Sequence, residues 1–313
     1  MNTILYGNGF NRLNKVKSWE SLVHIIDDSS DHCKVPNTLQ YEGKVLSVPF
    51  ETNARQLTSD GKALISSDKK IHSIRERSEV LIKQEIVNQM KTYKSNDLFD
   101  KLLRLNADHY ITTNYDYVAD DSLLRMNYTE NLLERDKSES LFSIHRKKSF
   151  VKNDNKKYLW KIHGELSNIG SIMLGYYHYC SYIGQIKKYL MGEYEFAKRK
   201  EMGTIPKIED RLPITFNGVL SWIDLFFMSN LYIIGLGLNY EEIDLWWILT
   251  IRKRLIQKLG RNIINNNIVY YGELEPGQKS MFEHLDVENV SSKKRKYENK
   301  YQEFIDDINR RIV

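Results

Sequence analysis

The sequence predicts an α/β protein with a Rossmann-like, mostly parallel sheet, helices on both faces of the sheet, and a helical insertion. Three observations support this fold class. Short apolar runs alternate along the chain with longer segments of helical spacing. Two of these runs end in a Gly-x-Gly turn, and a third ends in Asn and Asp. Strands that alternate with helices are typical of a parallel sheet that is covered on both sides.

Length and composition fit a globular protein with a sizeable core. The chain has 313 residues, of which 41% are hydrophobic and 12% aromatic. A formal net charge of +5 does not indicate a nucleic-acid partner. Cys33 and Cys180 are the only cysteines, which excludes a four-cysteine zinc cluster and a secreted disulfide scaffold. The chain has no signal-peptide pattern and no apolar stretch of about 18 residues, so we expect a soluble, cytoplasmic protein that does not enter the membrane.

The N-terminal elements follow from local patterns. Residues 4–6 form a short apolar strand, and residues 18–26 have helical spacing after a serine cap. Residues 28–70 are polar and are expected to be irregular, whereas residues 75–93 form an amphipathic helix. The spacing within residues 75–93 places five apolar residues on one side of that helix: Val80, Leu81, Ile86, Val87 and Met90. Residues 109–116 are rich in β-forming side chains.

The remaining elements complete one domain over residues 1–313. We expect residues of about 28–108 and 176–229 to form helical and irregular insertions that make up a smaller subdomain. The further predicted strands are residues 141–151 and 157–163, a candidate hairpin, and residues 171–175, 231–234 and 268–271. The further predicted helices are residues 176–190 and 240–259 and a closing helix from residue 297.

Two glycine turns are candidates for a phosphate site. Gly7-Asn8-Gly9 and Gly235-Leu236-Gly237 each follow an apolar strand. Glycine lets the backbone approach a phosphate closely and point amides at it. The dehydrogenase form of this turn fits poorly, because Arg12 stands where its third glycine should be and Asp27 ends a helical pattern rather than a strand. Tight strand-to-helix turns without a ligand remain an alternative explanation.

Polar residues at two strand ends are candidates for catalysis. Asn114 and Asp116 are two residues apart, so on an extended backbone their side chains face the same way, into the crevice at the carboxyl edge of the sheet. His163 ends another strand and can act as a general base near neutral pH. The alternative is that Asn114 and Asp116 cap the next helix and that His163 is a structural hydrogen-bonding residue.

Taken in order, these segments resemble the sirtuin superfamily, and more closely the SIR2-like proteins of bacterial anti-phage defence. The resemblance covers nearly the whole chain, and its specificity lies in the ordered set of motifs rather than in any one of them. The matching segments are residues 5–12, 111–117, 161–164, 232–238 and 241–247.

The resemblance implies that NAD⁺ binds as a substrate and that no metal is required. It places the pyrophosphate on the first glycine loop, the nicotinamide ribose beside the Asn and Asp motif, and the adenosine on the late glycine loop. The implied catalytic residues are Asn114, Asp116 and the base His163. The implied NAD⁺-binding residues are Gly7, Asn8, Gly9, Asn11, Thr113, Gly235, Gly237 and Asn239.

The departures from the family narrow the expected activity. Deacylating sirtuins usually carry a four-cysteine zinc module and a Gly-Ala-Gly-Ile-Ser loop, and this chain has neither. The defence-type relatives hydrolyse NAD⁺ to nicotinamide and ADP-ribose under the control of another domain or partner. We therefore expect an NAD⁺ hydrolase that acts as an abortive-infection effector and is activated by a protein partner or by homo-oligomerisation. The alternatives are a non-catalytic subunit that senses NAD⁺ or ADP-ribose, and an NAD-dependent protein deacylase.

Overall fold

The computed structural model describes residues 1–14, 38–43, 67–133, 141–195, 205–213 and 218–312. The helix predicted over residues 18–26 lies outside these ranges, as does most of the irregular region predicted over residues 28–70. Everything stated below about the structure refers to the described residues.

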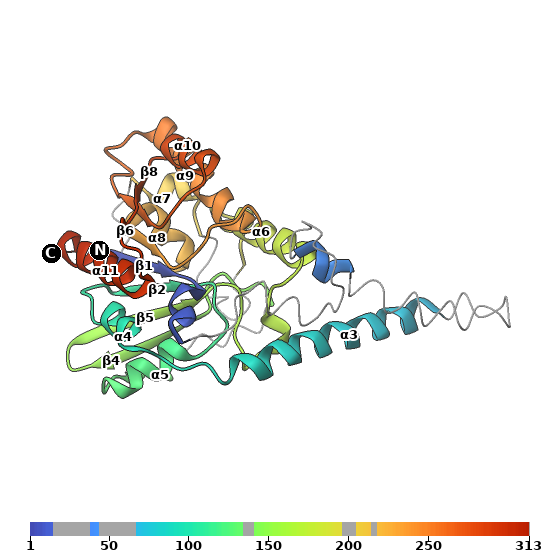
Figure 1. Ribbon diagram of the computed structural model, residues 1–313. Coiled ribbons are helices and arrows are strands. Elements are labelled where there is room, and N and C mark those ends of the chain that lie inside the picture. The colour runs from blue at the N-terminus through green and yellow to red at the C-terminus, as the bar shows by residue number, and fades with distance from the viewer. Residues whose placement is uncertain (15–37, 44–66, 134–140, 196–204, 214–217, 313) are drawn as a thin grey trace.

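A single eight-stranded sheet forms the centre of the protein (Figure 1), with the strand order β3-β4-β5-β2-β1-β6-β7-β8. The pairs β3–β4 and β4–β5 are antiparallel, and the other five pairs are parallel. This arrangement confirms the predicted mostly parallel sheet and the predicted hairpin. The strands are β1 (Asn2–Tyr6), β2 (His109–Thr112), β3 (Thr129–Glu130), β4 (Lys147–Lys152), β5 (Asn155–Lys161), β6 (Asn230–Ile234), β7 (Ile268–Tyr271) and β8 (Val287–Val290).

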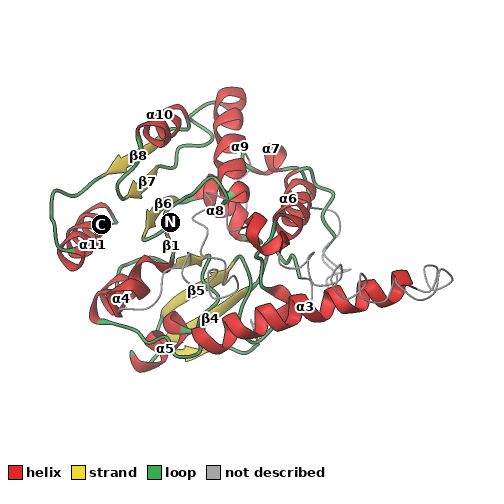
Figure 2. Ribbon diagram, turned by 45° about the vertical axis from the view of Figure 1, so that its right-hand side comes forward, coloured by secondary structure: helices red, strands yellow, loops and turns green. Residues whose placement is uncertain are grey.

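Helices cover both faces of this sheet (Figure 2), as the sequence predicts. The longer helices are α3 (Ser67–Met90), α5 (Val118–Arg125), α6 (Tyr176–Leu190), α9 (Ile243–Leu259), α10 (Pro276–His284) and α11 (Tyr297–Arg311). The shorter helices are α4 (Asp97–Leu103), α7 (Ile208–Arg211) and α8 (Trp222–Met228), with the 3₁₀ helices η1 (Asn8–Asn14) and η2 (Ile169–Ser171).

The core divides according to the alternation of side chains along the strands. On β1, Leu5 packs in a cluster with α6, α8, α9 and α10. Ile4 and Tyr6 point to the opposite face and pack in a second cluster with α4, α5 and α11. Successive strand residues face opposite sides of a sheet, so a run that is apolar at every position is buried on both.

Two local predictions are wrong. Residues 171–175 form no strand, because they leave η2 and continue as a loop toward α6. Val80 and Leu81 are 52% and 70% exposed rather than packed. The reason is that α3 extends beyond the body of the protein (Figure 1), and it is Ile86, Val87 and Met90, near its C-terminal end, that enter a hydrophobic cluster.

The insertions only partly stand apart from the sheet. Within the described parts of residues 28–108 and 176–229, the helices α4, α6 and α8 contribute to the two clusters on the sheet faces. The helix α3 instead contacts η2 and shares a third cluster with its neighbours. A smaller subdomain over these two ranges therefore stays a prediction.

Five parallel strands end at the same level, and this alignment positions the candidate site. Tyr6 at the end of β1 is paired with Thr112 of β2 and with Ile234 of β6. Thr112 is in turn paired with Lys161 of β5, and Ile234 with Tyr271 of β7. The loops that follow these strands therefore leave the sheet side by side, at the carboxyl edge where α/β folds bind ligands.

In the described part of the chain, no helix has both the length and the apolar character to cross a membrane.

Candidate functional site

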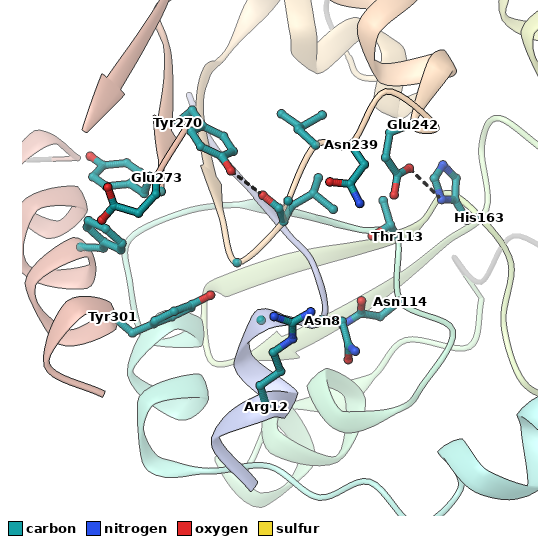
Figure 3. Close-up of a pocket in the computed structure, with 18 of the residues that line it drawn as sticks. Asn8, Arg12, Thr113, Asn114, His163, Asn239, Glu242, Tyr270, Glu273 and Tyr301 are labelled. Carbon is teal, nitrogen blue, oxygen red and sulfur yellow. Dashed lines mark hydrogen bonds and ion pairs between the residues drawn. The ribbon is translucent and has the colours of Figure 1, made fainter. Parts of the chain in front are cut away.

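A cavity of about 480 Å³ lies over the aligned strand ends, a size in the usual range for small-molecule sites. Figure 3 shows Asn114, His163 and Glu242 on one side of this cavity and Tyr301 and Glu273 on the opposite side. Asn8 and Arg12 lie between the two groups. Of the predicted site residues, the cavity is lined by Asn8, Gly9, Thr113, Asn114, His163, Gly235, Gly237 and Asn239.

Neighbouring strands bring Asn114 and His163 to one end of the cavity. Their strands β2 and β5 are paired in parallel, and beyond the last pair the amide of Ile162 donates to the Thr112 carbonyl at 3.1 Å. The Thr112 hydroxyl accepts from the Asn114 amide at 3.0 Å and fixes the start of the loop. Asn114 is 8% exposed, and its side-chain nitrogen Nδ2 has no hydrogen-bond partner among the described residues. The two predicted residues are therefore together in the cavity wall.

His163 is held by two acids that sequence analysis did not single out. Its Nε2 lies 2.8 Å from Oδ2 of Asp244, and its Nδ1 lies 3.7 Å from Oε2 of Glu242. Glu242 immediately precedes α9 and Asp244 is in its first turn, where the positive end of the helix dipole stabilises acidic side chains. Glu242 lines the cavity, and its Oε2 forms no hydrogen bond within the described protein.

Burial and nearby charges shift the pKa values of His163 and Glu242. Burial opposes the charged imidazolium, but the carboxylates of Asp244 and Glu242 outweigh it, so the pKa of His163 lies above its ordinary value of 6.5. Burial raises the pKa of Glu242 to about 7, with the nearby His163 working in the opposite direction. Glu242 therefore titrates near neutral pH, and the pKa values of both groups are shifted upward, which is typical of sites that transfer protons.

Asp116 does not face the cavity, so the expectation that it shares a direction with Asn114 is wrong. Its Oδ2 accepts from Nδ2 of Asn11 at 2.9 Å, and its Oδ1 accepts from the Val118 amide at 3.0 Å. The physical reason is that β2 ends at Thr112, so the two-residue alternation of a strand no longer holds over residues 113–116. Burial raises the pKa of Asp116 above its ordinary value, although the positive charge of Lys161 opposes this shift.

Asn11 is likewise behind the cavity wall rather than in it. It is 1% exposed, and its Nδ2 donates to Asn8 at 2.8 Å as well as to Asp116. Asn8 itself lines the cavity and has an Nδ2 without a partner among the described residues. Asp116 and Asn11 therefore orient Asn8 toward the cavity, and the capping alternative for Asp116 matches its contact with the Val118 amide at the start of α5.

The glycines of the two turns bring the loops against each other. The Gly9 amide donates to the Gly235 carbonyl at 2.8 Å, and the Gly7 amide donates to the Ile234 carbonyl at 3.3 Å. A Cβ on Gly7 would lie 2.8 Å from the same Gly235 oxygen. These two amides are thus engaged by the protein, and Gly7 lies behind the cavity lining rather than in it. Gly235 has a φ of +68°, which requires glycine at that turn.

Arg12 follows the first glycine turn and was not predicted as a site residue. It lines the cavity, is exposed, and forms no ion pair or hydrogen bond with the described part of the chain. An unengaged guanidinium beside two glycine turns is suited to a phosphate oxygen. The signal was present in the sequence as the residue that replaces the third glycine of the dinucleotide-binding turn.

Tyrosines from α11 and β7 complete the opposite end of the cavity. The Tyr297 hydroxyl donates to the Gly9 carbonyl at 2.9 Å, and the Tyr270 hydroxyl donates to the Leu236 carbonyl at 2.9 Å. Tyr301 packs against Tyr297 with ring centroids 4.6 Å apart. The ion pair between Lys300 and Glu273, at 3.2 Å, lies at this end as well. The aromatic surface is therefore anchored to both glycine loops.

Two carboxylates and one imidazole lie close enough together to suggest a cation site. Ligand atoms of His163, Glu242 and Asp244 are all within 4.8 Å of one another. However, the 2.8 Å contact between His163 Nε2 and Asp244 is a hydrogen-bond distance, so this nitrogen is already engaged. We therefore interpret the three residues as a proton-transfer group.

Neither a scan against protein-family models nor a search of curated proteins finds a match to this chain.

Proposed function

We propose that this protein hydrolyses NAD⁺ to nicotinamide and ADP-ribose in the cavity at the carboxyl edge of the sheet. One observation carries the proposal. At one end of the cavity a buried imidazole lies beside two polar atoms, Asn114 Nδ2 and Glu242 Oε2, that have no hydrogen-bond partner among the described residues. Leaving such an atom unpaired costs about 1–3 kcal/mol, so these atoms are best explained by a polar ligand that completes their hydrogen bonds.

The rest of the cavity supports a dinucleotide rather than a smaller ligand. Arg12 offers a positive charge to the pyrophosphate between the two ends. The rings of Tyr270 and Tyr301 offer apolar surface to the adenine at the far end. Glu273 offers a carboxylate to ribose hydroxyls beside them.

The chemistry at the imidazole end fits cleavage of the nicotinamide–ribose bond. Nicotinamide leaves NAD⁺ as a neutral molecule, so its departure needs little acid catalysis, and the barrier lies in the positive charge that develops on the ribose. Asn114 holds the attacking water or the ribose hydroxyls, and His163 accepts the proton of the water. Glu242 replaces Asp116 as the carboxylate beside the ribose, because it is Glu242 that lines the cavity.

The experiment is to incubate the purified protein with NAD⁺ and to quantify nicotinamide and ADP-ribose by chromatography with mass spectrometry. We expect His163→Ala and Asn114→Ala each to reduce the rate by about 10²–10⁴-fold. His284→Ala, which removes an exposed imidazole on α10 outside the cavity, serves as the matched control and should retain the full rate. Full activity in either cavity variant would refute the proposal.

A binding measurement separates the hydrolase from its alternatives. ADP-ribose at 100 times its dissociation constant should stabilise the fold by about 2.7 kcal/mol. NAD⁺ that stabilises the protein without nicotinamide release, in the presence of every candidate partner, would instead support the sensor function. Formation of O-acyl-ADP-ribose from an acylated peptide would support the deacylase. Activation by a partner or by homo-oligomerisation predicts a specific activity that rises with protein concentration or with the added partner.

A further inference from the structure

His163 is contacted at its two ring nitrogens by acids with different surroundings. Asp244 is fully buried and does not line the cavity, and its Oδ2 lies 2.8 Å from Nε2. Glu242 does line the cavity, its side chain is 21% exposed, and its Oε2 lies 3.7 Å from Nδ1. One nitrogen therefore faces the interior of the protein and the other faces a carboxylate that a ligand can reach.

This asymmetry fixes the tautomer of the imidazole. A carboxylate that accepts a hydrogen bond from Nε2–H leaves the lone pair of the neutral ring on Nδ1. The same arrangement, with an acid behind a histidine, orients the base in catalytic triads. Here the orienting acid is Asp244, and Nδ1 is left facing Glu242 and the cavity.

We propose that Asp244, His163 and Glu242 form a buried proton relay, in which Asp244 is the positioning residue of the histidine and Glu242 is a catalytic residue that takes the proton from Nδ1. This inference rests on the proposed NAD⁺ hydrolysis. It adds two residues, both brought to the site by the N-terminal end of α9, to the carboxamide and the imidazole that the sequence motifs predict.

Asp244 and Glu242 are the charged neighbours of the His163 imidazole, because the tyrosines packed around it stay neutral. The rings of Tyr179 and Tyr182 on α6 lie with centroids 5.3 and 6.3 Å from that of His163. Burial raises the pKa of both tyrosines well above 10, so they stay neutral. Burial does the same to the pKa of Tyr115, on the loop after β2. The protonation of His163 is thus governed by burial and by Asp244 and Glu242.

Glu242 is suited to carry a proton. Burial raises its pKa to about 7, so this carboxyl can take up a proton and release it again near neutral pH. Glu241, next along the chain, adds to this rise through its negative charge.

The relay accounts for every bond and proton of the reaction. The water oxygen forms a bond to the ribose C1′ while the bond from C1′ to the nicotinamide nitrogen breaks, and its electron pair leaves with nicotinamide. The proton of the water passes to Nδ1 of His163, then to the Glu242 carboxylate and to solvent. Asp244 keeps its contact with Nε2 throughout and gains no proton in this scheme. The products are nicotinamide, ADP-ribose and one proton.

The test compares Asp244→Asn with Asp224→Asn, since both parent carboxylates are fully buried. Asp224 lies on α8 and accepts from Tyr189 and Arg211, outside the cavity. Two readouts are used: the ¹⁵N chemical shifts of His163 across a pH titration, and the pH profile of kcat and KM for NAD⁺.

For the wild type we expect the Nε2–H tautomer and a His163 pKa above 6.5. In Asp244→Asn this pKa should fall, because burial remains while the nearer of the two carboxylates is lost, and the acid limb of kcat should move to lower pH. The maximal kcat should fall by about 10²–10⁴-fold with little change in KM. Glu242→Gln should lower kcat by a factor similar to that of Asp244→Asn and should keep the Nε2–H tautomer of His163.

Asp224→Asn should lower the melting temperature and leave the tautomer and the pH profile unchanged; Asp286→Asn, at a surface ion pair, repeats this control with less risk to folding. The relay is refuted if Asp244→Asn retains the wild-type pKa and tautomer, or if Glu242→Gln retains full kcat. The NMR readout needs no turnover, so a protein that never cleaves NAD⁺ would refute the proposed function while the titration still decides the contact with Asp244.

Discussion

Replacing Gly9 with alanine tests whether the close approach of the two glycine loops shapes the cavity. A Cβ at this position would overlap the Tyr301 hydroxyl and would lie 2.7 Å from Cα and 2.8 Å from the carbonyl oxygen of Gly235. The loops must therefore separate. Separation breaks the 2.8 Å hydrogen bond from Gly9 to Gly235 and strains the 2.9 Å hydrogen bond from Tyr297 to the Gly9 carbonyl.

The size of the effect follows from these contacts. Inserting a methyl group into a packed site costs about 1–3 kcal/mol, and one lost hydrogen bond adds about 0.5–1.5 kcal/mol. The sum is a loss of about 2–4 kcal/mol, which lowers the melting temperature of a domain of this size by about 3–6 °C. Because Tyr301 and the loop line the cavity, the stabilisation by ADP-ribose should be lost as well.

The matched control is Gly184→Ala. Gly184 lies within α6, and a Cβ there would meet nothing within 4 Å. Alanine in a helix interior stabilises by about 0.5–1 kcal/mol relative to glycine, so this variant should melt at or slightly above the wild-type temperature. Calorimetry with and without ADP-ribose measures both effects. A Gly9→Ala protein that melts within about 1 °C of the wild type and still binds ADP-ribose would refute the reasoning.

Four further predictions test the site and its surroundings. Gly237→Ala places a Cβ 3.4 Å from Asn239 Oδ1, an ordinary contact, so stability should change by less than about 0.5 kcal/mol and any loss of ADP-ribose affinity in calorimetry would report close approach of the ligand. Asp116→Ala removes one of the two acceptors of Asn11 Nδ2 and the acceptor of the Val118 amide, and it should cost about 1–3 kcal/mol in urea unfolding; no loss would contradict these contacts. The hydrogen bond from His178 on α6 lowers the pKa of Glu79 to about 2, against 4.5 in the unfolded chain. The contribution of Glu79 to stability is therefore present above pH 4.5 and is lost as the pH falls toward 2. The difference in unfolding free energy between the wild type and Glu79→Gln should shrink over that window. EDTA should leave the rate of nicotinamide release unchanged. If EDTA lowered that rate and a divalent cation restored it, His163, Glu242 and Asp244 would be a cation site rather than a proton-transfer group.

The fold and one end of the site were predictable because their signals are local. The run at residues 231–234 is apolar on both faces, and the structure places it between two other parallel strands as part of β6. Asn114 and His163 lie at the ends of predicted strands, and parallel strands that end in register bring such residues together whatever their separation in the chain. The strand ends therefore made each residue a candidate, and the family resemblance implied that both act at one site.

The other residues escaped prediction because their roles depend on contacts distant in sequence. Asp244 meets His163 across 81 residues, and in the sequence it is only an acid in the first turn of a helix. Arg12 is visible in the sequence as the residue that replaces a third glycine, but its place in the cavity depends on the late glycine turn beside it. Val80 and Leu81 fit the apolar side of a helix by spacing, but the helix extends past the surface that would bury them.

Asp116 shows why a motif can be informative even where the role of one member is mistaken. Its carboxylate holds Asn11, which holds Asn8, and Asn8 presents an unpaired amide to the cavity, so residues of the first loop and of the Asn and Asp motif form one hydrogen-bonded unit. Loss of Asp116 should therefore impair ligand binding through the orientation of Asn8. That defect resembles the loss of a catalytic carboxylate in an activity assay, but it differs in its cause: it should appear as weaker binding of ADP-ribose, in which no bond remains to be cleaved.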